Sequence, residues 1–168
     1  MGLVKSRNKG LSLIKGEFFL FVDSDNFLDI DFIEKCYQKL QLCQADIAYS
    51  DLYDPDHNTM FLKSKTYQLS TFLERSYIDS CSLVRNSVRK NALYDINLNN
   101  KKMEDYDFWL NLIINNNAKP VYVENTKLNY RVIENSMSKR DSTKYYFEIY
   151  LQILSKYQIS FLMKFIMP

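Results

Sequence analysis

Residues 16–26 read GEFFLFVDSDN, an apolar run that ends abruptly in two acids one residue apart. The run has the length and the aromatic composition of a buried strand, which predicts a strand over residues 16–22. In open α/β sheets, ligands bind at the carboxyl ends of the strands. Asp23 and Asp25 are therefore candidate ligand-binding residues.

The same two acids have the chemistry of a divalent-metal site. Side chains alternate along an extended segment, so Asp23 and Asp25 are expected on one side, with Ser24 turned away. Carboxylate oxygens suit Mg²⁺ or Mn²⁺, particularly when substrate phosphates complete the coordination shell. A D-x-D pattern is also common at turns, where Asp and Asn satisfy local backbone groups. The residues alone leave both interpretations open.

The composition is that of a folded, single-domain protein. The chain has 168 residues and is 46% hydrophobic, enough to bury a core. Its net charge of +2 gives no strong field for nucleic acid. Cys36 and Cys43 are seven residues apart on a predicted helix and are expected on its inner face. Together with Cys81 they form neither a disulfide framework nor a metal-ligand spacing, which favours a reduced, cytoplasmic protein.

The sequence shows no secretory signal and no run of about 20 apolar residues that would span a membrane. The apolar tail over residues 159–167 is interrupted by Lys164. We expect this tail to pack against the domain, and the alternative is a peripheral contact with a membrane or a partner chain.

Alternating strand and helix signals predict the α/β class. Helices are expected over 7–14, 31–44, 66–74, 85–91, 103–114 and 143–164. Strands are expected over 16–22, 45–53, 60–62, 77–84 and 121–123. The helix over 31–44 begins with Asp31 and Glu34 in a capping-box arrangement.

A second acidic group opens the predicted helix over 103–114, where residues 104–109 read EDYDFW. Acids in a first helical turn complement the helix dipole, which is a structural explanation for them. Adjacent carboxylates also repel one another, and such grouping can raise one pKa and produce a general base. Glu104 and Asp105 are therefore candidate catalytic residues.

Three further polar positions are ambiguous from the residues alone. Arg7 and Asn8 either contact a phosphate or a base, or are solvated polar residues. Arg131 supplies a cation after a predicted strand. His57 is the only histidine and lies in an Asp-rich loop, which predicts an exposed residue and argues against His-based triads and His-rich zinc sites.

Five motifs follow one another along the chain. They are SRNKGL at 6–11, KGE at 15–17 with the strand into DSDN, YIDSCSL at 77–83, MEDYDFW at 103–109, and YR at 130–131 leading to SMS at 136–138. As a set and in this order, they resemble the family 2 glycosyltransferases of the GT-A fold, over nearly the whole chain. The resemblance implies a Rossmann-like mixed sheet flanked by helices. We expect one domain over 1–168, in which 143–168 is a C-terminal helical segment.

The resemblance implies a role for each matching acid. Asp25 would hold the Mn²⁺ or Mg²⁺ that bridges the donor diphosphate, and Asp23 would contact the ribose side of the nucleotide or assist with the metal. Asp105 would deprotonate the acceptor hydroxyl, and Glu104 would orient the acceptor or the base. These roles require the two acidic segments to converge on one cleft.

Arg7, Asn8 and Arg131 would be substrate-binding residues, the two arginines as contacts of the diphosphate. The implied enzyme is an inverting, hexosyl-transferring glycosyltransferase that uses a UDP- or GDP-sugar and a glycan or lipid-linked acceptor. Its expected role is in bacterial surface polysaccharide synthesis, in the cytoplasm or peripherally at the inner face of the membrane.

Two departures from the family pattern stand out. Family members begin with a strand of the type V-S-V-I-I-P-x-Y-N, and the chain is expected to lack this N-terminal nucleotide-binding part. An exposed sheet edge would then favour self-association. Ile133 stands where a metal-binding histidine is often found. The alternative function is a non-catalytic remnant that binds an acceptor glycan or a partner chain.

Overall fold

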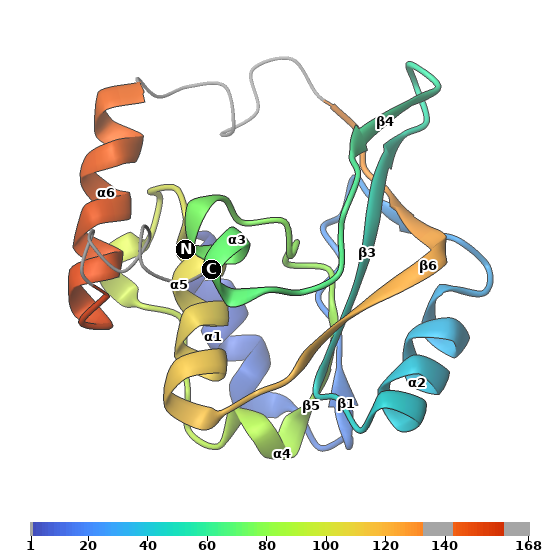
Figure 1. Ribbon diagram of the computed structural model, residues 1–168, viewed down its shortest axis with the longest axis horizontal. Coiled ribbons are helices and arrows are strands. Elements are labelled where there is room, and N and C mark those ends of the chain that lie inside the picture. The colour runs from blue at the N-terminus through green and yellow to red at the C-terminus, as the bar shows by residue number, and fades with distance from the viewer. Residues whose placement is uncertain (1, 133–142, 160–168) are drawn as a thin grey trace.

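A six-stranded mixed sheet forms the centre of the computed structural model, which describes residues 2–132 and 143–159 (Figure 1). The strands are β1 (Phe18–Phe19), β2 (Phe27–Leu28), β3 (Ile47–Asp54), β4 (Thr59–Leu62), β5 (Leu83–Arg85) and β6 (Pro120–Asn129). Their order is β1-β5-β3-β6-β2, with β4 paired to β3. β3 and β6 are parallel, whereas the other pairs are antiparallel. The predicted α/β class is confirmed.

Helices cover both faces of this sheet. They are α1 (Leu3–Leu13), α2 (Phe32–Cys43), α3 (Leu69–Glu74), α4 (Asn86–Arg89), α5 (Glu104–Leu110) and α6 (Thr143–Lys156). A short 3-10 helix, η1 (Ile96–Leu98), precedes α5, and a π-helical turn, η2 (Asn111–Asn115), continues it. The predicted helix over 143–164 is confirmed up to Lys156, and its last residues lie outside the described part of the chain. None of the helices in the described ranges is long and apolar enough to cross a membrane.

β3 is buried on both faces, which divides the core into two parts. Ile47 and Tyr49 belong to the larger cluster, which includes residues of α1, α3, α5 and α6. Ala48 and Leu52 belong to the smaller cluster, under α2. Because successive side chains point to opposite faces of a strand, the apolar residues of β3 contribute to both cores. Figure 1 shows α2 separated by the sheet from α1 and α5.

The predicted strand over 16–22 is wrong in length, since only Phe18 and Phe19 pair with β5. Leu20 packs against the smaller core and Phe21 against the larger one, both without strand pairing, whereas Val22 is exposed. The chain then continues to β2 at the opposite end of the strand order. The apolar run therefore marks a segment between two cores, and hydrophobicity alone does not distinguish this from a longer strand.

The predicted strand over 121–123 is too short, because β6 has 10 residues. Its register against β3 shifts between Tyr49 and Asp51, whose partners are Tyr122 and Lys127. Asn125, inside the skipped segment, has a φ of 60°. An irregular polar segment of this kind breaks the alternating pattern that identifies a strand in the sequence.

Two local predictions on α2 are also wrong. Asp31 makes no side-chain cap hydrogen bond, because its carboxylate accepts from Thr126 at 3.1 Å and pairs with Lys35 at 2.6 Å. Cys36 is buried as expected, but Cys43 is exposed at the last residue of the helix. The contact of Asp31 with Thr126 depends on the packing of α2 against β6, which a helical pattern does not contain.

Polar contacts join α6 to α5 at the end of α6. The carboxylate of Asp107 is 1% exposed and accepts two hydrogen bonds from Lys156 Nζ, each 2.9 Å long. The Tyr157 hydroxyl donates to the same carboxylate at 3.0 Å, and Lys156 also reaches Asp95 at 3.0 Å. Burial raises the pKa of Asp107, and the Lys156 ammonium opposes that rise. The buried carboxylate is thus stabilised mainly by α6.

Lys156→Met is expected to lower the free energy of unfolding by about 1–3 kcal/mol, because a buried carboxylate then loses its cationic partner. Urea unfolding at neutral pH measures this change. Lys119→Met is the matched control, since Lys119 is exposed and its side chain makes no described ion pair. Equal stabilities of the two variants would contradict the prediction.

Candidate active site

The segment with Asp23 and Asp25 and the loop over 79–82 lie at the same end of the sheet. β1 and β5 are antiparallel, so Phe19 at the end of β1 lies beside the start of β5 and the 79–82 loop before it. β5 is antiparallel to β3, which places this loop toward the carboxyl ends of β3 and β6. Residues 20–26 leave β1 at the same end. This is the end at which open α/β sheets bind ligands.

Arg7 connects the two acidic segments. Its guanidinium Nη1 donates to Glu104 Oε1 at 3.2 Å, and Nη2 lies 3.5 Å from Asp23 Oδ1. Nη2 also donates to Ser80 Oγ at 3.0 Å. The Arg7 side chain is 6% exposed, so the interpretation of Arg7 as a solvated residue is wrong. The carboxylates of Asp23 and Glu104 therefore both contact the buried Arg7 guanidinium.

Asp105 lies beside this contact without an ion pair to Arg7. Its Oδ1 accepts from the backbone N–H of Tyr106 at 2.8 Å, at the first turn of α5. Met103, directly before the helix, has a left-handed φ of 68°, which turns the chain into α5. Glu104 and Asp105 thus have different surroundings. Glu104 is paired with Arg7, whereas Asp105 lines a pocket.

Asp79 is a further acid of the site to which the sequence analysis gave no role. It lies in the loop before β5, and its Oδ1 accepts from the backbone N–H of Cys81 at 2.8 Å. Its neighbour Ser80 binds Arg7. The available signal was one acid inside an otherwise weakly polar motif, YIDSCSL, which was recognised only for its place in the motif order.

Several carboxyl groups of the site lie near one another and near a single arginine, Arg7. Burial raises the pKa of Asp79 to about 6, with Asp105 and Asp23 adding to the rise. Burial and the neighbouring Asp105 raise the pKa of Glu104 to about 7. Burial also raises the pKa of Asp105, and the Arg7 charge opposes this. A carboxylate with a raised pKa is a stronger base than an ordinary one.

Asp23 and Asp25 lie in a tight turn, because the Asn26 N–H donates to the Asp23 carbonyl at 3.0 Å. The extended backbone expected here is wrong, and the shared orientation of the two carboxylates stays a prediction. Asp23 is 43% exposed beside Arg7. Asp25 is exposed and makes no hydrogen bond or ion pair with the described residues.

These two carboxylates fit a hard divalent cation that takes its remaining ligands from elsewhere. Across residues 2–132 and 143–159, no three His, Cys, Asp or Glu side chains are grouped as metal ligands. Mg²⁺ is commonly bound by one or two carboxylates together with substrate phosphates and water. The exposed carboxylates of Asp23 and Asp25 suit that arrangement.

The remaining predicted residues are placed differently. Asn8 uses both side-chain atoms on the Tyr94 backbone, at 2.9 and 2.8 Å, which is a structural role. Arg131 is exposed beside the turn: its N–H donates to Asn26 Oδ1 at 3.1 Å, and its guanidinium lies 3.9 Å from Asp56. His57 is 67% exposed, as predicted.

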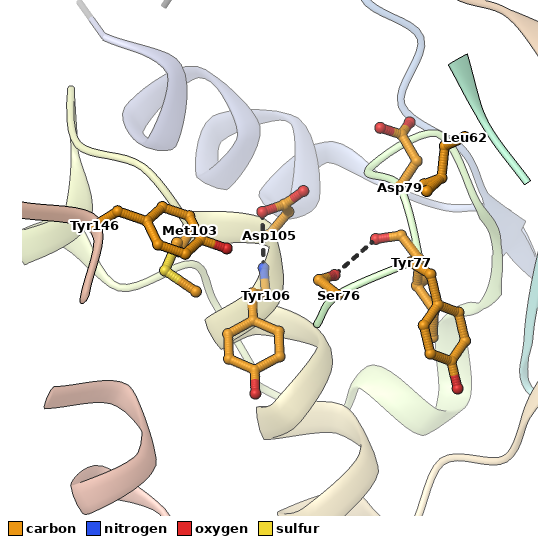
Figure 2. A pocket seen from close by; sticks show the side chains of 9 residues that line it. Leu62, Ser76, Tyr77, Asp79, Met103, Asp105, Tyr106 and Tyr146 are labelled. Atoms are coloured by element: carbon orange, nitrogen blue, oxygen red, sulfur yellow. Dashed lines mark hydrogen bonds between the residues drawn. The ribbon is translucent and has the colours of Figure 1, made fainter. Parts of the chain in front are cut away.

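A pocket of about 210 Å³ opens over Asp105. Figure 2 shows Asp105 in the pocket wall, with Tyr146 to one side and Asp79 to the other. The pocket is lined by Leu62, Ser76, Tyr77, Ile78, Asp79, Met103, Asp105, Tyr106 and Tyr146. A carboxylate at the wall of a pocket can act on a substrate hydroxyl, whereas one that is paired inside the protein cannot.

Comparison with known proteins assigns the family. The family model "Glycosyl transferase family 2" matches residues 1–101, and the chain belongs to this family. Glycosyltransferase GlyA of Streptococcus pneumoniae serotype 4 is 42% identical over 52 residues, which are 31% of this chain and 8% of that protein. The uncharacterized glycosyltransferase MJ1057 of Methanocaldococcus jannaschii is 26% identical over 157 residues, which are 87% of this chain and 53% of that protein.

Solved structures agree on the fold. S. aureus TarS 1–349 in complex with UDP-GlcNAc superposes with a TM-score of 0.68 at 18% identity, over 93% of this chain and 46% of that one. This likeness confirms the GT-A-like fold. The chain thus spans about half the length of MJ1057 and of TarS 1–349.

Proposed function

We propose that this chain carries the metal-binding and acceptor-activating residues of an inverting glycosyltransferase that transfers a sugar from a nucleotide-sugar to a glycan or lipid-linked acceptor. The observation that carries the proposal is the shared contact of Asp23 and Glu104 with the buried Arg7 guanidinium. That contact supports a single site that contains Asp23, a candidate metal ligand, and Glu104, the neighbour of the candidate base Asp105.

In this mechanism Asp105 is the general base. It lines the pocket and has a raised pKa, so it can accept the proton of an acceptor hydroxyl there. Glu104 is held by Arg7 and positions the first turn of α5. Loss of the proton makes the acceptor oxygen nucleophilic, and its attack from the face opposite the leaving diphosphate inverts the anomeric centre.

Asp25 and Asp23 would hold Mg²⁺ or Mn²⁺, which when bound neutralises charge on the departing diphosphate. Arg131 is exposed next to the same turn and is a candidate contact of the diphosphate. The proposed role of Arg7 changes from a diphosphate contact to a link between acids, because Nη1 and Nη2 of its guanidinium already have partners. The cytoplasmic location, the peripheral membrane contact, the self-association and the role in a surface polysaccharide stay predictions.

Calorimetry with UDP- and GDP-sugars tests the donor side of the proposal. Binding is expected to require Mn²⁺ or Mg²⁺, and Asp25→Ala should weaken it at least about tenfold, as loss of about 1.4 kcal/mol would. Glu34→Gln on α2 is the matched control, an exposed acid outside the site. If no sugar nucleotide gives metal-dependent heat, this chain does not bind a donor, and the alternative of a non-catalytic remnant is favoured.

A further inference from the structure

The outer wall of the pocket comes from α6, which lies beyond the residues that match the family model. Tyr146, the fourth residue of this helix, is 41% exposed and lines the pocket. In Figure 2 its hydroxyl is directed toward Asp105. The proximity of the two groups also contributes to the raised pKa of Tyr146, after burial.

The pocket has a distinctive charge. Asp79 and Asp105 line it, and none of the described residues that line it is Lys or Arg. Arg7 lies behind the wall with its guanidinium bound to Glu104 and Ser80. Burial already disfavours charge on both lining carboxyls, so an anionic ligand would add repulsion in a poorly solvated place.

Apart from Ser76, the rest of the lining is apolar and aromatic. Leu62, Ile78, Met103 and the rings of Tyr77, Tyr106 and Tyr146 supply this surface. A sugar ring has C–H faces that pack on such surfaces, and a rim of hydroxyls that donate to carboxylates. The volume of about 210 Å³ is below the usual range for drug-sized ligands, which suits a single ring.

We propose that this pocket binds one neutral sugar ring of the acceptor, with Tyr146 packing against the ring and Asp79 accepting a hydrogen bond from one of its hydroxyls. The inference rests on the proposed function and adds the substrate class: acceptors whose reacting residue is uncharged. Uronic acids and phosphorylated sugars are excluded by Asp79 and Asp105. Asp79 and Tyr146 are then specificity-determining residues, distinct from the base.

The test uses the whole chain and simple probes, namely methyl glycosides of neutral hexoses and N-acetylhexosamines, with methyl glucuronides as the anionic counterparts. Amide chemical-shift titration by NMR is expected to show neutral glycosides perturbing residues 76–79, 103–106 and 146. Methyl glucuronides should bind at least about tenfold more weakly. The inference is overturned if no neutral glycoside perturbs these residues, or if the glucuronides bind equally well.

Variants separate the two proposed contacts. Tyr146→Ala is expected to weaken glycoside binding about tenfold, with Tyr146→Phe keeping most of it. Phe147→Ala is the matched control, because Phe147 is 50% exposed on the same helix and packs on Tyr150, outside the pocket lining. Asp79→Asn keeps an oxygen that accepts from the Cys81 N–H. This variant should reduce the difference in affinity between neutral and anionic glycosides. An unchanged ratio of the affinities for neutral and anionic glycosides would exclude Asp79 as the source of charge selection.

Failure of this inference is distinguishable from failure of the proposed function. Metal-dependent donor binding with no glycoside in the pocket would overturn the inference alone. Glycoside binding without donor heat would leave the pocket assignment in place and remove the catalytic role of this chain.

Discussion

Asp105→Asn is expected to lower the rate of sugar transfer by about 10²- to 10⁴-fold, the usual contribution of a general base. Metal-dependent donor binding should stay intact, because Asp105 is not among the candidate metal ligands. The substitution keeps the size of the side chain and the oxygen that accepts from the Tyr106 N–H. It removes the capacity to take a proton from the acceptor.

The pH profile separates this role from a structural one. Burial raises the pKa of Asp105, so transfer should increase with pH as this group loses its proton, at a pH above the ordinary range for Asp. The residual activity of Asp105→Asn should lack that acidic limb. Glu124→Gln, an exposed acid on β6, should leave both rate and profile unchanged. A transfer rate of Asp105→Asn within a few-fold of the parent rate would exclude Asp105 as the base.

Arg7→Met is expected to lower the free energy of unfolding by about 3–5 kcal/mol at pH 8, the typical effect of removing one partner of a buried ion pair. The Arg7 side chain is 6% exposed. Without it, the carboxylates of Glu104 and Asp23 lose their cation, and Asp79 and Asp105 lose a nearby positive charge.

The difference in unfolding free energy between Arg7→Met and the parent protein should become smaller as the pH falls. The pKa values of Asp79 and Glu104 are raised to about 6 and about 7 in the folded state. The folded protein therefore holds protons that the unfolded chain has released, and stability decreases as pH rises from about 4 to about 7. The positive charge of Arg7 reduces this decrease in stability with rising pH. In Arg7→Met the decrease should therefore be steeper and should continue to higher pH. At pH 5 the variant should recover part of its stability.

Urea unfolding measured through the fluorescence of Trp109, which is fully buried, follows both effects. Arg85→Met is the matched control: Arg85 pairs with Glu17 and Asp46, but it is 23% exposed and lies outside the acid cluster. Equal deficits for Arg7→Met at pH 5 and pH 8 would show that lost packing, rather than lost charge, explains the change.

The sequence identifies this site to the extent that its features are local. Two acids after an apolar run, and two acids at a helix start, are visible without any fold. The position of Arg7 is not, because its partner Glu104 lies 97 residues away and the pairing depends on how α1 and α5 pack. Asp79 was missed for the same reason, since its neighbours along the chain do not mark it as part of an acidic cluster.

Strand lengths were the other weak point of the sequence analysis. Leu20 and Phe21 pack in two different cores without strand pairing, and a polar irregularity hides the length of β6. In both cases tertiary contacts, rather than local propensity, decide the backbone. The α/β class was predictable because alternating strands and helices do not depend on those boundaries.

The proposed base and the outer wall of the pocket lie on different helices. Asp105 belongs to α5, whereas Tyr146 belongs to α6, which is fastened through Lys156 and Tyr157 at its far end. If the two proposed roles are correct, substitutions near the start of α6 alter the fit of a sugar and leave the base in place. Acceptor preference can diverge among evolutionary descendants while the chemical step is inherited unchanged.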